Sequence, residues 1–163
     1  MKSFLVMFIF TIFFVGCADK NAFTKFDMTT AQELTASSLQ SSKIKFSNGI
    51  DGIVSVVYLN DVYPHRYFTN EYFFVYLYLK NKKKMYNPTM LEDVDLVLKL
   101  NNKLPIKIKK LSHDNEFSDL INTKSKWNRY YLVAFKKEKS NKLSIVLENG
   151  QSFSDPLTYQ KDE

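Results

Sequence analysis

Side chains suited to nucleophilic or acid–base chemistry are scarce in this 163-residue chain, which holds two histidines and one cysteine. His65 falls in an expected loop, and His113 is followed directly by Asp114. Neighbouring residues on a strand point in opposite directions, so His113 and Asp114 are not expected to act as a pair. Neither histidine belongs to a recognisable nucleophile–base arrangement. We therefore expect both to be surface residues and the protein not to be an enzyme.

Metal and phosphate sites are also not expected. Two histidines and one cysteine cannot supply a Cys/His zinc cluster, and four scattered glycines leave no glycine-rich phosphate loop. Glu92, Asp93 and Asp95 form a small acidic group that could attract calcium, but the spacing of an EF-hand is missing. We interpret these three side chains as solvated charges and expect no metal or cofactor.

The basic residues give the chain a net charge of +6 and gather around residues 80–84, 107–110 and 136–142. Nucleic-acid surfaces combine arginine with aromatic platforms, and this chain has only two arginines. We expect no nucleic-acid partner. The lysines are explained by solubility and by protection of sheet edges, with attraction to anionic lipid headgroups or acidic glycans as the alternative.

The N-terminus has the pattern of an export signal. Lys2 precedes thirteen uncharged residues, 4–16, and Cys17 is followed at once by the polar residues 18–21. A membrane-spanning helix needs about 20 apolar residues, whereas thirteen is a usual length for the apolar region of a signal peptide. Residues 1–16 are therefore predicted to be a signal peptide. An ordinary secretory signal with an incidental cysteine, or an uncleaved anchor, is the alternative.

The segment Phe14-Val15-Gly16-Cys17 resembles the lipobox of bacterial lipoproteins, although Phe14 stands where leucine is usual. The resemblance implies cleavage between Gly16 and Cys17 and covalent lipid on Cys17, with residues 17–27 as an acylated tether. Two or more acyl chains give stable attachment to a membrane. Ala18, rather than aspartate, follows the cysteine, which by the same resemblance implies the outer membrane, with the domain facing either the periplasm or the exterior.

Residues 28–163 are expected to form one domain. Thr30-Ala31-Gln32-Glu33 has the spacing of a capping box, so the segment 28–42 is either a short helix or a ragged first strand. From residue 44 onward the apolar residues alternate, which is typical of β-strands. The predicted strands are 53–59, 72–79, 94–100, 104–109, 129–135, 143–147 and a short piece at 157–159.

Two local features refine this pattern. Asn101 and Asn102 lie between the strands 94–100 and 104–109, which are predicted to pair as a hairpin, and Pro105 places the second strand at a sheet edge. Residues 114–124 are expected to form a short helical crossover. Short strands bounded by turn residues favour an all-β, antiparallel sandwich or barrel.

The segment Tyr131-x-Val133-x-Phe135 is similar to the penultimate strand of immunoglobulin domains. The resemblance implies an immunoglobulin-like β-sandwich of about seven strands, as in small lipoproteins of bacterial envelopes. Val133 stands where such domains have a core cysteine, and Trp127 lies outside the strand that would carry their buried tryptophan. A small barrel or another sandwich is the competing fold.

The strand 72–79 is apolar on both faces, with Tyr76 and Tyr78 on one of them. Only one face of a sandwich strand meets the core, so the tyrosine face must be covered by the chain itself, by a partner or by water. Tyr63, Arg66 and Tyr67 lie in the loop before this strand, and tyrosine and arginine are frequent at binding hot spots.

These observations predict a non-catalytic lipoprotein domain that binds another macromolecule through Tyr63, Arg66, Tyr67, Tyr76 and Tyr78. The partner would be an envelope complex or a host or environmental surface. The alternative function is a carrier of lipid or a small ligand in an apolar cavity lined by aromatic strands.

Overall fold

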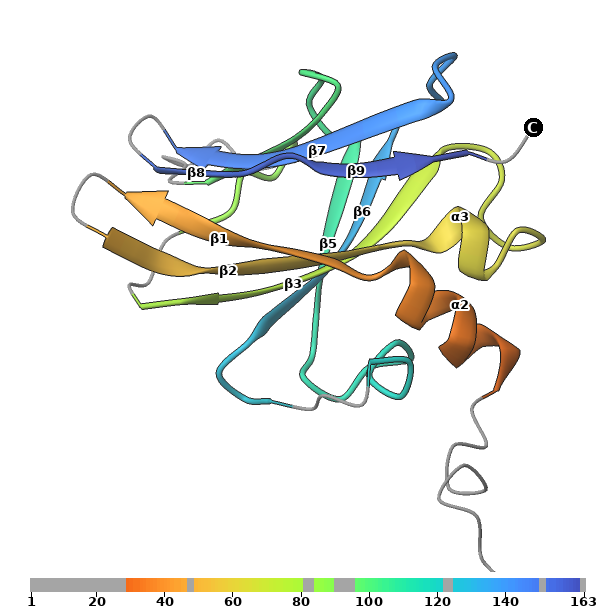
Figure 1. Ribbon diagram of the computed structural model, residues 1–163, viewed down its shortest axis with the longest axis horizontal. Coiled ribbons are helices and arrows are strands. Elements are labelled where there is room, and N and C mark those ends of the chain that lie inside the picture. The colour runs from red at the N-terminus through yellow and green to blue at the C-terminus, as the bar shows by residue number, and fades with distance from the viewer. Residues whose placement is uncertain are drawn as a thin grey trace, which may run out of the picture.

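The computed structural model describes residues 29–46, 49–80, 84–89, 96–121, 125–149 and 152–161 (Figure 1). The predicted signal peptide, the tether and Cys17 lie outside these residues, as do Glu92, Asp93 and Asp95. The elements follow one another as α2 (Thr30–Ser38), β1 (Gln40–Phe46), β2 (Gly49–Tyr58), α3 (Leu59–Val62), β3 (Glu71–Leu79), β4 (Val97–Leu100), β5 (Lys107–Leu111), β6 (Arg129–Phe135), β7 (Lys142–Asn149), β8 (Ser152–Ser154) and β9 (Leu157–Gln160).

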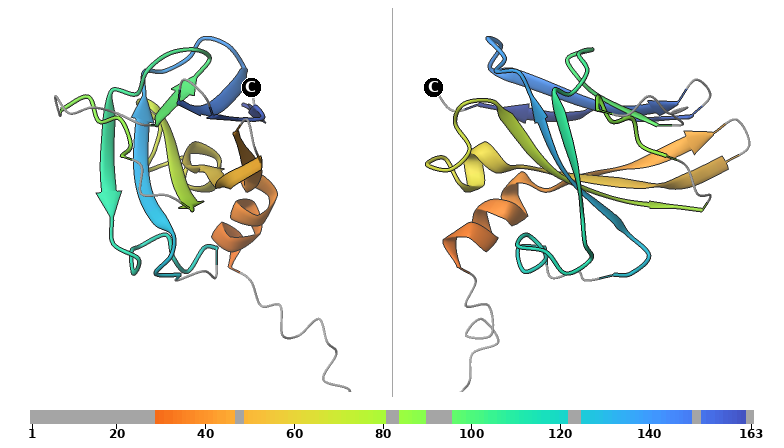
Figure 2. Two further views of the ribbon diagram at one scale, coloured as in Figure 1. Left: turned by 90° about the vertical axis from the view of Figure 1, so that its left-hand side faces the viewer. Right: turned by 180° about the vertical axis from the view of Figure 1, so that it is seen from behind.

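The strands form one continuous antiparallel sheet in the order β4-β7-β8-β1-β2-β3-β6-β5, with β9 paired to β7. The all-β, antiparallel prediction is therefore confirmed. A two-sheet immunoglobulin-like sandwich of about seven strands is not confirmed, because the described strands number nine and β8 links β1 to β7 within a single sheet. The sheet curls into a half-barrel in which β7 and β9 lie over β1, β2 and β3 (Figures 1 and 2).

The main core fills the space inside this curl. Alternate residues of β3, including Phe73 and Val75, point inward and meet Leu98 of β4 and Leu147 of β7, all of them fully buried. Tyr159 of β9 reaches across the layers, and its hydroxyl donates to the Val56 carbonyl at 2.8 Å. Apolar side chains from both ends of the sheet thus share one core, which is the main source of stability for a domain of this kind.

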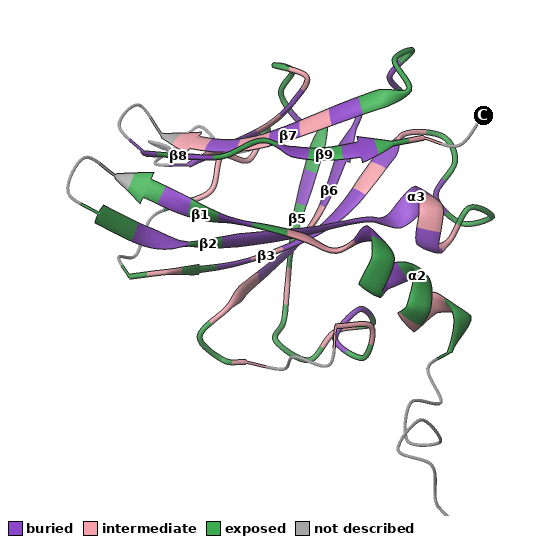
Figure 3. Cartoon of the chain, viewed as in Figure 1, coloured by how far each residue is buried: buried purple, intermediate pink, exposed green. Residues whose placement is uncertain are grey.

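A second apolar cluster covers part of the outer face of the sheet. Val57, Phe74 and Tyr130 are buried beneath Phe117, which comes from the turns between β5 and β6, while α2 and α3 contribute from the other side. Figure 3 shows the buried stretches of β2 and β3 beside these covering elements. The tyrosine face of β3 is therefore largely covered by the chain itself.

The N-terminal segment contains both structures that the sequence left open. Thr29, one residue before the predicted cap, forms the capping box with Gln32, and α2 ends just before β1 begins. Ser38 links the two elements to the sheet, because its hydroxyl accepts a hydrogen bond from the Tyr58 amide at 3.1 Å.

The predicted hairpin of 94–100 with 104–109 is wrong. Asn101 and Asn102 do reverse the chain with φ of 46° and 64°, and one bridge joins Leu100 to Lys103. Beyond it β4 pairs with β7, while β5 pairs with β6 at the other end of the sheet order. Turn chemistry fixes where a chain reverses, whereas burial of apolar side chains selects the partner strand. The edge position predicted for the second strand is confirmed.

Residues 114–121 form turns instead of the expected helical crossover, and they connect neighbouring antiparallel strands. The Asn115 side chain accepts from the Phe117 amide at 3.0 Å, and the Ser118 hydroxyl donates to the His113 carbonyl at 3.0 Å. Such side-chain bonds compete with a helix for the backbone groups. They place Phe117 over the sheet.

Candidate interaction loop

The loop of residues 63–70, between α3 and β3, presents two contrasting kinds of side chain. Arg66 and Phe68 are exposed, Phe68 to 63%. Tyr67, between them, is buried. The loop thus exposes a cation and an aromatic ring, while Tyr67 between them is anchored in the domain. Such side chains are frequent at protein-binding interfaces.

Asn60 of α3 holds the two ends of this loop together. Its amide nitrogen donates to the Asn70 carbonyl at 2.7 Å, and its oxygen accepts from the Tyr72 amide at 2.8 Å. Within the loop, the amides of Arg66 and Tyr67 both donate to the Tyr63 carbonyl at 3.0 Å. The backbone of the loop is therefore ordered by its own hydrogen bonds.

Tyr67 anchors the loop to the cluster on the outer face. Its ring lies 4.9 Å from that of Tyr72, 6.3 Å from Tyr63 and 6.5 Å from Phe117, measured between centroids. Burial raises the pKa of Tyr67, and burial raises the pKa of Tyr63 as well.

Arg66 is oriented from two sides. Its guanidinium lies 2.8 Å from the Glu116 carboxylate and 5.2 Å from the centre of the Tyr67 ring. The hydrogen bond to Glu116 raises the pKa of Arg66. Because both charged side chains are exposed, the ion pair itself adds little stability. Its effect is to hold the guanidinium over the Tyr67 ring.

Tyr76 and Tyr78 lie toward the other end of β3. Tyr78 is six residues after Tyr72, a separation of about 20 Å along an extended strand. Tyr76 is half-buried between Phe74 and Tyr130, at 5.8 and 6.1 Å between ring centroids. Tyr78 is 42% exposed. The five tyrosine and arginine residues predicted to share one face therefore occupy two places, because Phe117 and its neighbours cover the sheet between them.

A row of hydroxyl groups marks where that cover ends. The Ser41 and Ser55 hydroxyls lie 2.7 Å apart on β1 and β2, and Ser55 also hydrogen-bonds the Tyr76 hydroxyl. Burial raises the pKa of Tyr76 despite that bond. Beyond this row, Ile53 of β2 pairs with Tyr78 of β3, and both side chains are exposed.

A buried charged cluster escaped the sequence analysis. Glu71 is fully buried at the start of β3, where it accepts from the Tyr58 hydroxyl at 2.6 Å, the Glu138 amide at 2.9 Å and Lys161 at 3.2 Å. Burial alone would raise the pKa of Glu71, but these hydrogen bonds outweigh it and lower the pKa. The one sequence feature that could have indicated this cluster is the position of Glu71 as the first residue of an otherwise apolar strand.

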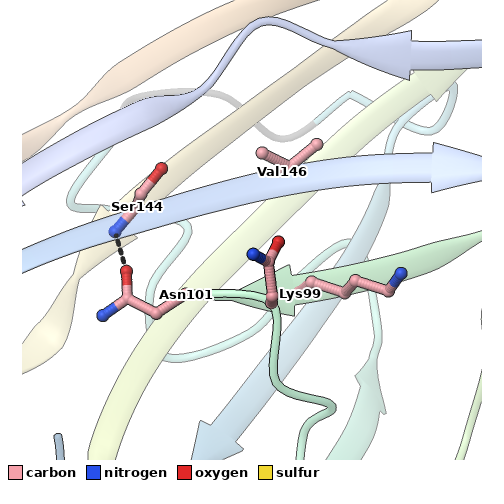
Figure 4. A pocket seen from close by; sticks show the side chains of 5 residues that line it. Lys99, Asn101, Ser144 and Val146 are labelled. Carbon is pink, nitrogen blue, oxygen red and sulfur yellow. Dashed lines mark hydrogen bonds between the residues drawn. The ribbon is translucent and has the colours of Figure 1, made fainter.

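Most of the residues that line two surface pockets are polar. One, of about 320 Å³, lies over β4 and β7 (Figure 4). There the Asn101 side chain accepts from the Ser144 amide at 2.9 Å and donates to the Lys142 carbonyl at 3.3 Å. The other, of about 280 Å³, lies between α2 and β9. The asparagine in the first pocket is used to close a turn, so we assign no chemistry to it.

His65 and His113 are both exposed. Among the residues that the structure describes, no group of three or more histidine, cysteine, aspartate or glutamate side chains is placed to hold a metal ion. Neither of the described helices has the length and apolar character of a membrane span. Comparison with known proteins gives no matching family model, no matching curated protein and no matching solved structure.

Proposed function

We propose that the chain is a bacterial envelope lipoprotein, lipid-anchored through Cys17, whose non-catalytic β domain binds another protein through the 63–70 loop. The observation that carries the binding role is the display of Arg66 and Phe68 on a loop closed by Asn60. The anchor rests on the sequence Phe14-Val15-Gly16-Cys17.

The order of the loop supports this role. Binding costs free energy when a mobile segment has to be fixed, and a segment that is already ordered avoids much of that cost. The buried Tyr67 and the Asn60 hydrogen bonds supply such order. The Phe68 side chain is 63% exposed, so it is not part of the core. It offers a partner apolar area that binding would bury.

The partner follows from the proposed location. An outer-membrane lipoprotein meets subunits of envelope complexes in the periplasm, or a host or environmental surface if it faces outward. We retain a relationship to immunoglobulin-like domains as part of the proposal. It is supported by the packing of two portions of the curled sheet around one core.

Site-specific crosslinking in living cells tests the loop. A photoreactive phenylalanine analogue at Phe68 should give a discrete protein adduct, and Arg66→Ala should reduce its yield. The matched control is the same analogue at Phe153, an exposed phenylalanine on β8. Equal adduct patterns from positions 68 and 153, or no adduct from position 68, would remove the loop from the proposal.

A further inference from the structure

At the end of the sheet that holds Ile53 and Tyr78, side chains of the outer face are exposed, Ile53 to 46% and Tyr78 to 42%. These residues pair across β2 and β3, Lys43 pairs with Ile53 from β1, and all three are exposed. Lys80, also exposed, directly follows the end of β3. We call Lys43, Ile53, Tyr78 and Lys80 the open patch. It combines apolar area with two ammonium groups.

Trp127 stands at the same end of the sheet. It precedes Arg129, which pairs with Leu77, so its turn lies level with the end of β3. Its side chain is 81% exposed, more than that of any other large hydrophobic residue that the structure describes, and Lys126 beside it is exposed too. In Figures 1 and 2 the strands β7 and β9 lie on one side of β1–β3, and the segment that leads into β6 lies on the opposite side. That opposite side is the one that the outer face of the sheet faces.

The chain also enters the domain from this side. The start of α2 and the turns between β5 and β6 both lie on the lower side of the sheet in all three views of Figures 1 and 2. Thr29 is twelve residues after Cys17, and twelve residues span at most about 43 Å. A lipid on Cys17 would therefore keep the domain within that distance of the bilayer. The lower side of Figure 1 would face the bilayer, although α2 lies at the other end of β2 from Ile53.

We propose that the open patch and Trp127 lie against the anionic headgroups of the membrane that holds the lipid anchor. Tryptophan and tyrosine favour the interface of a bilayer, where the ring is buried and its polar atom stays hydrated. Lysines near an anionic surface add attraction. This inference rests on the proposed anchor at Cys17 and is independent of the 63–70 loop.

The charge distribution localises the contact. Three acidic residues of the turns between β5 and β6, namely Asp114, Glu116 and Asp119, lie on the segment that covers the other part of the outer face. Glu116 is paired with Arg66, and the Asp119 carbonyl accepts from Gln32 of α2. The lysine-flanked open patch is therefore the part of this side that suits an anionic surface.

The test uses the full lipidated chain, purified from membranes and reconstituted into vesicles of phosphatidylethanolamine and phosphatidylglycerol. Trp127 is the only tryptophan, so its fluorescence reports on this turn alone. Brominated phosphatidylglycerol should quench it, and the vesicles should protect it from aqueous acrylamide. In Lys43→Gln/Lys80→Gln the ratio of membrane-contacting to free domain should fall about 25-fold, because each lysine contributes about fivefold. The matched controls, Lys139→Gln and Phe68→Ser, should leave the quenching unchanged.

Three results would overturn the inference in different ways. If the chain floats with the vesicles while Trp127 stays open to acrylamide and unquenched by bromolipid, the anchor stands and the contact is wrong. If the chain does not float at all, the anchor and the contact fail together. Protection of Trp127 in native membranes but not in pure lipid vesicles would assign the patch to a protein, against the lipid contact.

Discussion

Replacing Glu71 with glutamine tests how the buried cluster holds the ends of the domain together. The carboxylate joins β3 to the Glu138 amide and to Lys161, which follows β9. Glutamine keeps the shape but puts an NH2 group where one carboxylate oxygen accepted a hydrogen bond. Either Tyr58 or the Glu138 amide then faces a donor, and the Lys161 side chain, only 14% exposed, loses its counter-charge.

The magnitude follows from these two losses. A buried donor without a partner costs about 1–3 kcal/mol, and breaking a buried ion pair from one side costs about 3–5 kcal/mol in total. For a domain of this size, with an m-value of about 2 kcal/mol/M, the urea midpoint should fall by roughly 2 M. The assay is equilibrium unfolding followed by far-ultraviolet circular dichroism, on chain made without residues 1–16 and with Cys17→Ser.

The control is an exposed ion pair of the same kind. Lys45 contacts Asp155 at 2.7 Å, with both side chains about half exposed, so Lys45→Gln should change the free energy of unfolding by less than about 1 kcal/mol. The double variant Glu71→Leu/Lys161→Met should recover part of the loss, since it leaves no unpaired charge. A Glu71→Gln loss no larger than that of Lys45→Gln would refute the reasoning.

Three further predictions follow from the same contacts and from the sequence. The pKa of Glu71 is lowered in the folded state from its ordinary value of 4.5. Its stabilising contribution should therefore be present above about pH 4.5 and be lost as the pH falls through the folded pKa. The free energy of unfolding should accordingly fall less steeply with decreasing pH in Glu71→Gln than in the wild type. Phe117→Ala should lower the free energy of unfolding by about 3–5 kcal/mol, as measured by urea, and expose Phe74 and Tyr67. Cys17→Ser should abolish the acyl mass on the N-terminal peptide and release the chain from the membrane fraction.

Each of these has a contrary result. A pH profile identical in wild type and Glu71→Gln would mean that other carboxylates dominate acid unfolding. A Phe117→Ala effect below 1 kcal/mol, the size of a surface change, would mean that the turns do not seal the outer face. An unmodified Cys17 in wild type would remove the anchor and the membrane contact built on it.

The strands show how far sequence periodicity extends. Runs of large apolar residues identified β2, β3 and β6, which bury side chains on both faces, and alternation identified β7. Phe73 and Val75 share one face because alternate residues of a strand point the same way. The three-residue strand β8 escaped because its Ser152 and Ser154 are buried polar residues with no apolar repeat. Strand partners could not be read either, since β4 and β5 flank one turn yet pair at opposite ends of the sheet order.

The candidate site shows the same division. Residue types at Tyr63, Arg66 and Tyr67 indicated a loop worth testing, but types alone cannot say that Tyr67 is buried while Phe68 is exposed. The grouping with Tyr76 and Tyr78 failed because Phe117, more than forty residues later in the chain, covers the sheet between them. Glu71 gave no sign of its partners, because Lys161 comes ninety residues later.

The sequence by itself determined the strand-rich character of the domain, the strong central strand and the features that predict an anchor at Cys17. These depend on local properties, namely side-chain alternation and the length of an apolar run. The edge position of β5 agrees with the prediction from Pro105, although Pro105 lies two residues before that strand. Only the tertiary structure decided that the sheet is continuous, which part of the aromatic face stays open and which charges are buried together. Those outcomes depend on contacts between residues far apart in the chain, whose selection is made by packing over the whole domain rather than by any local pattern.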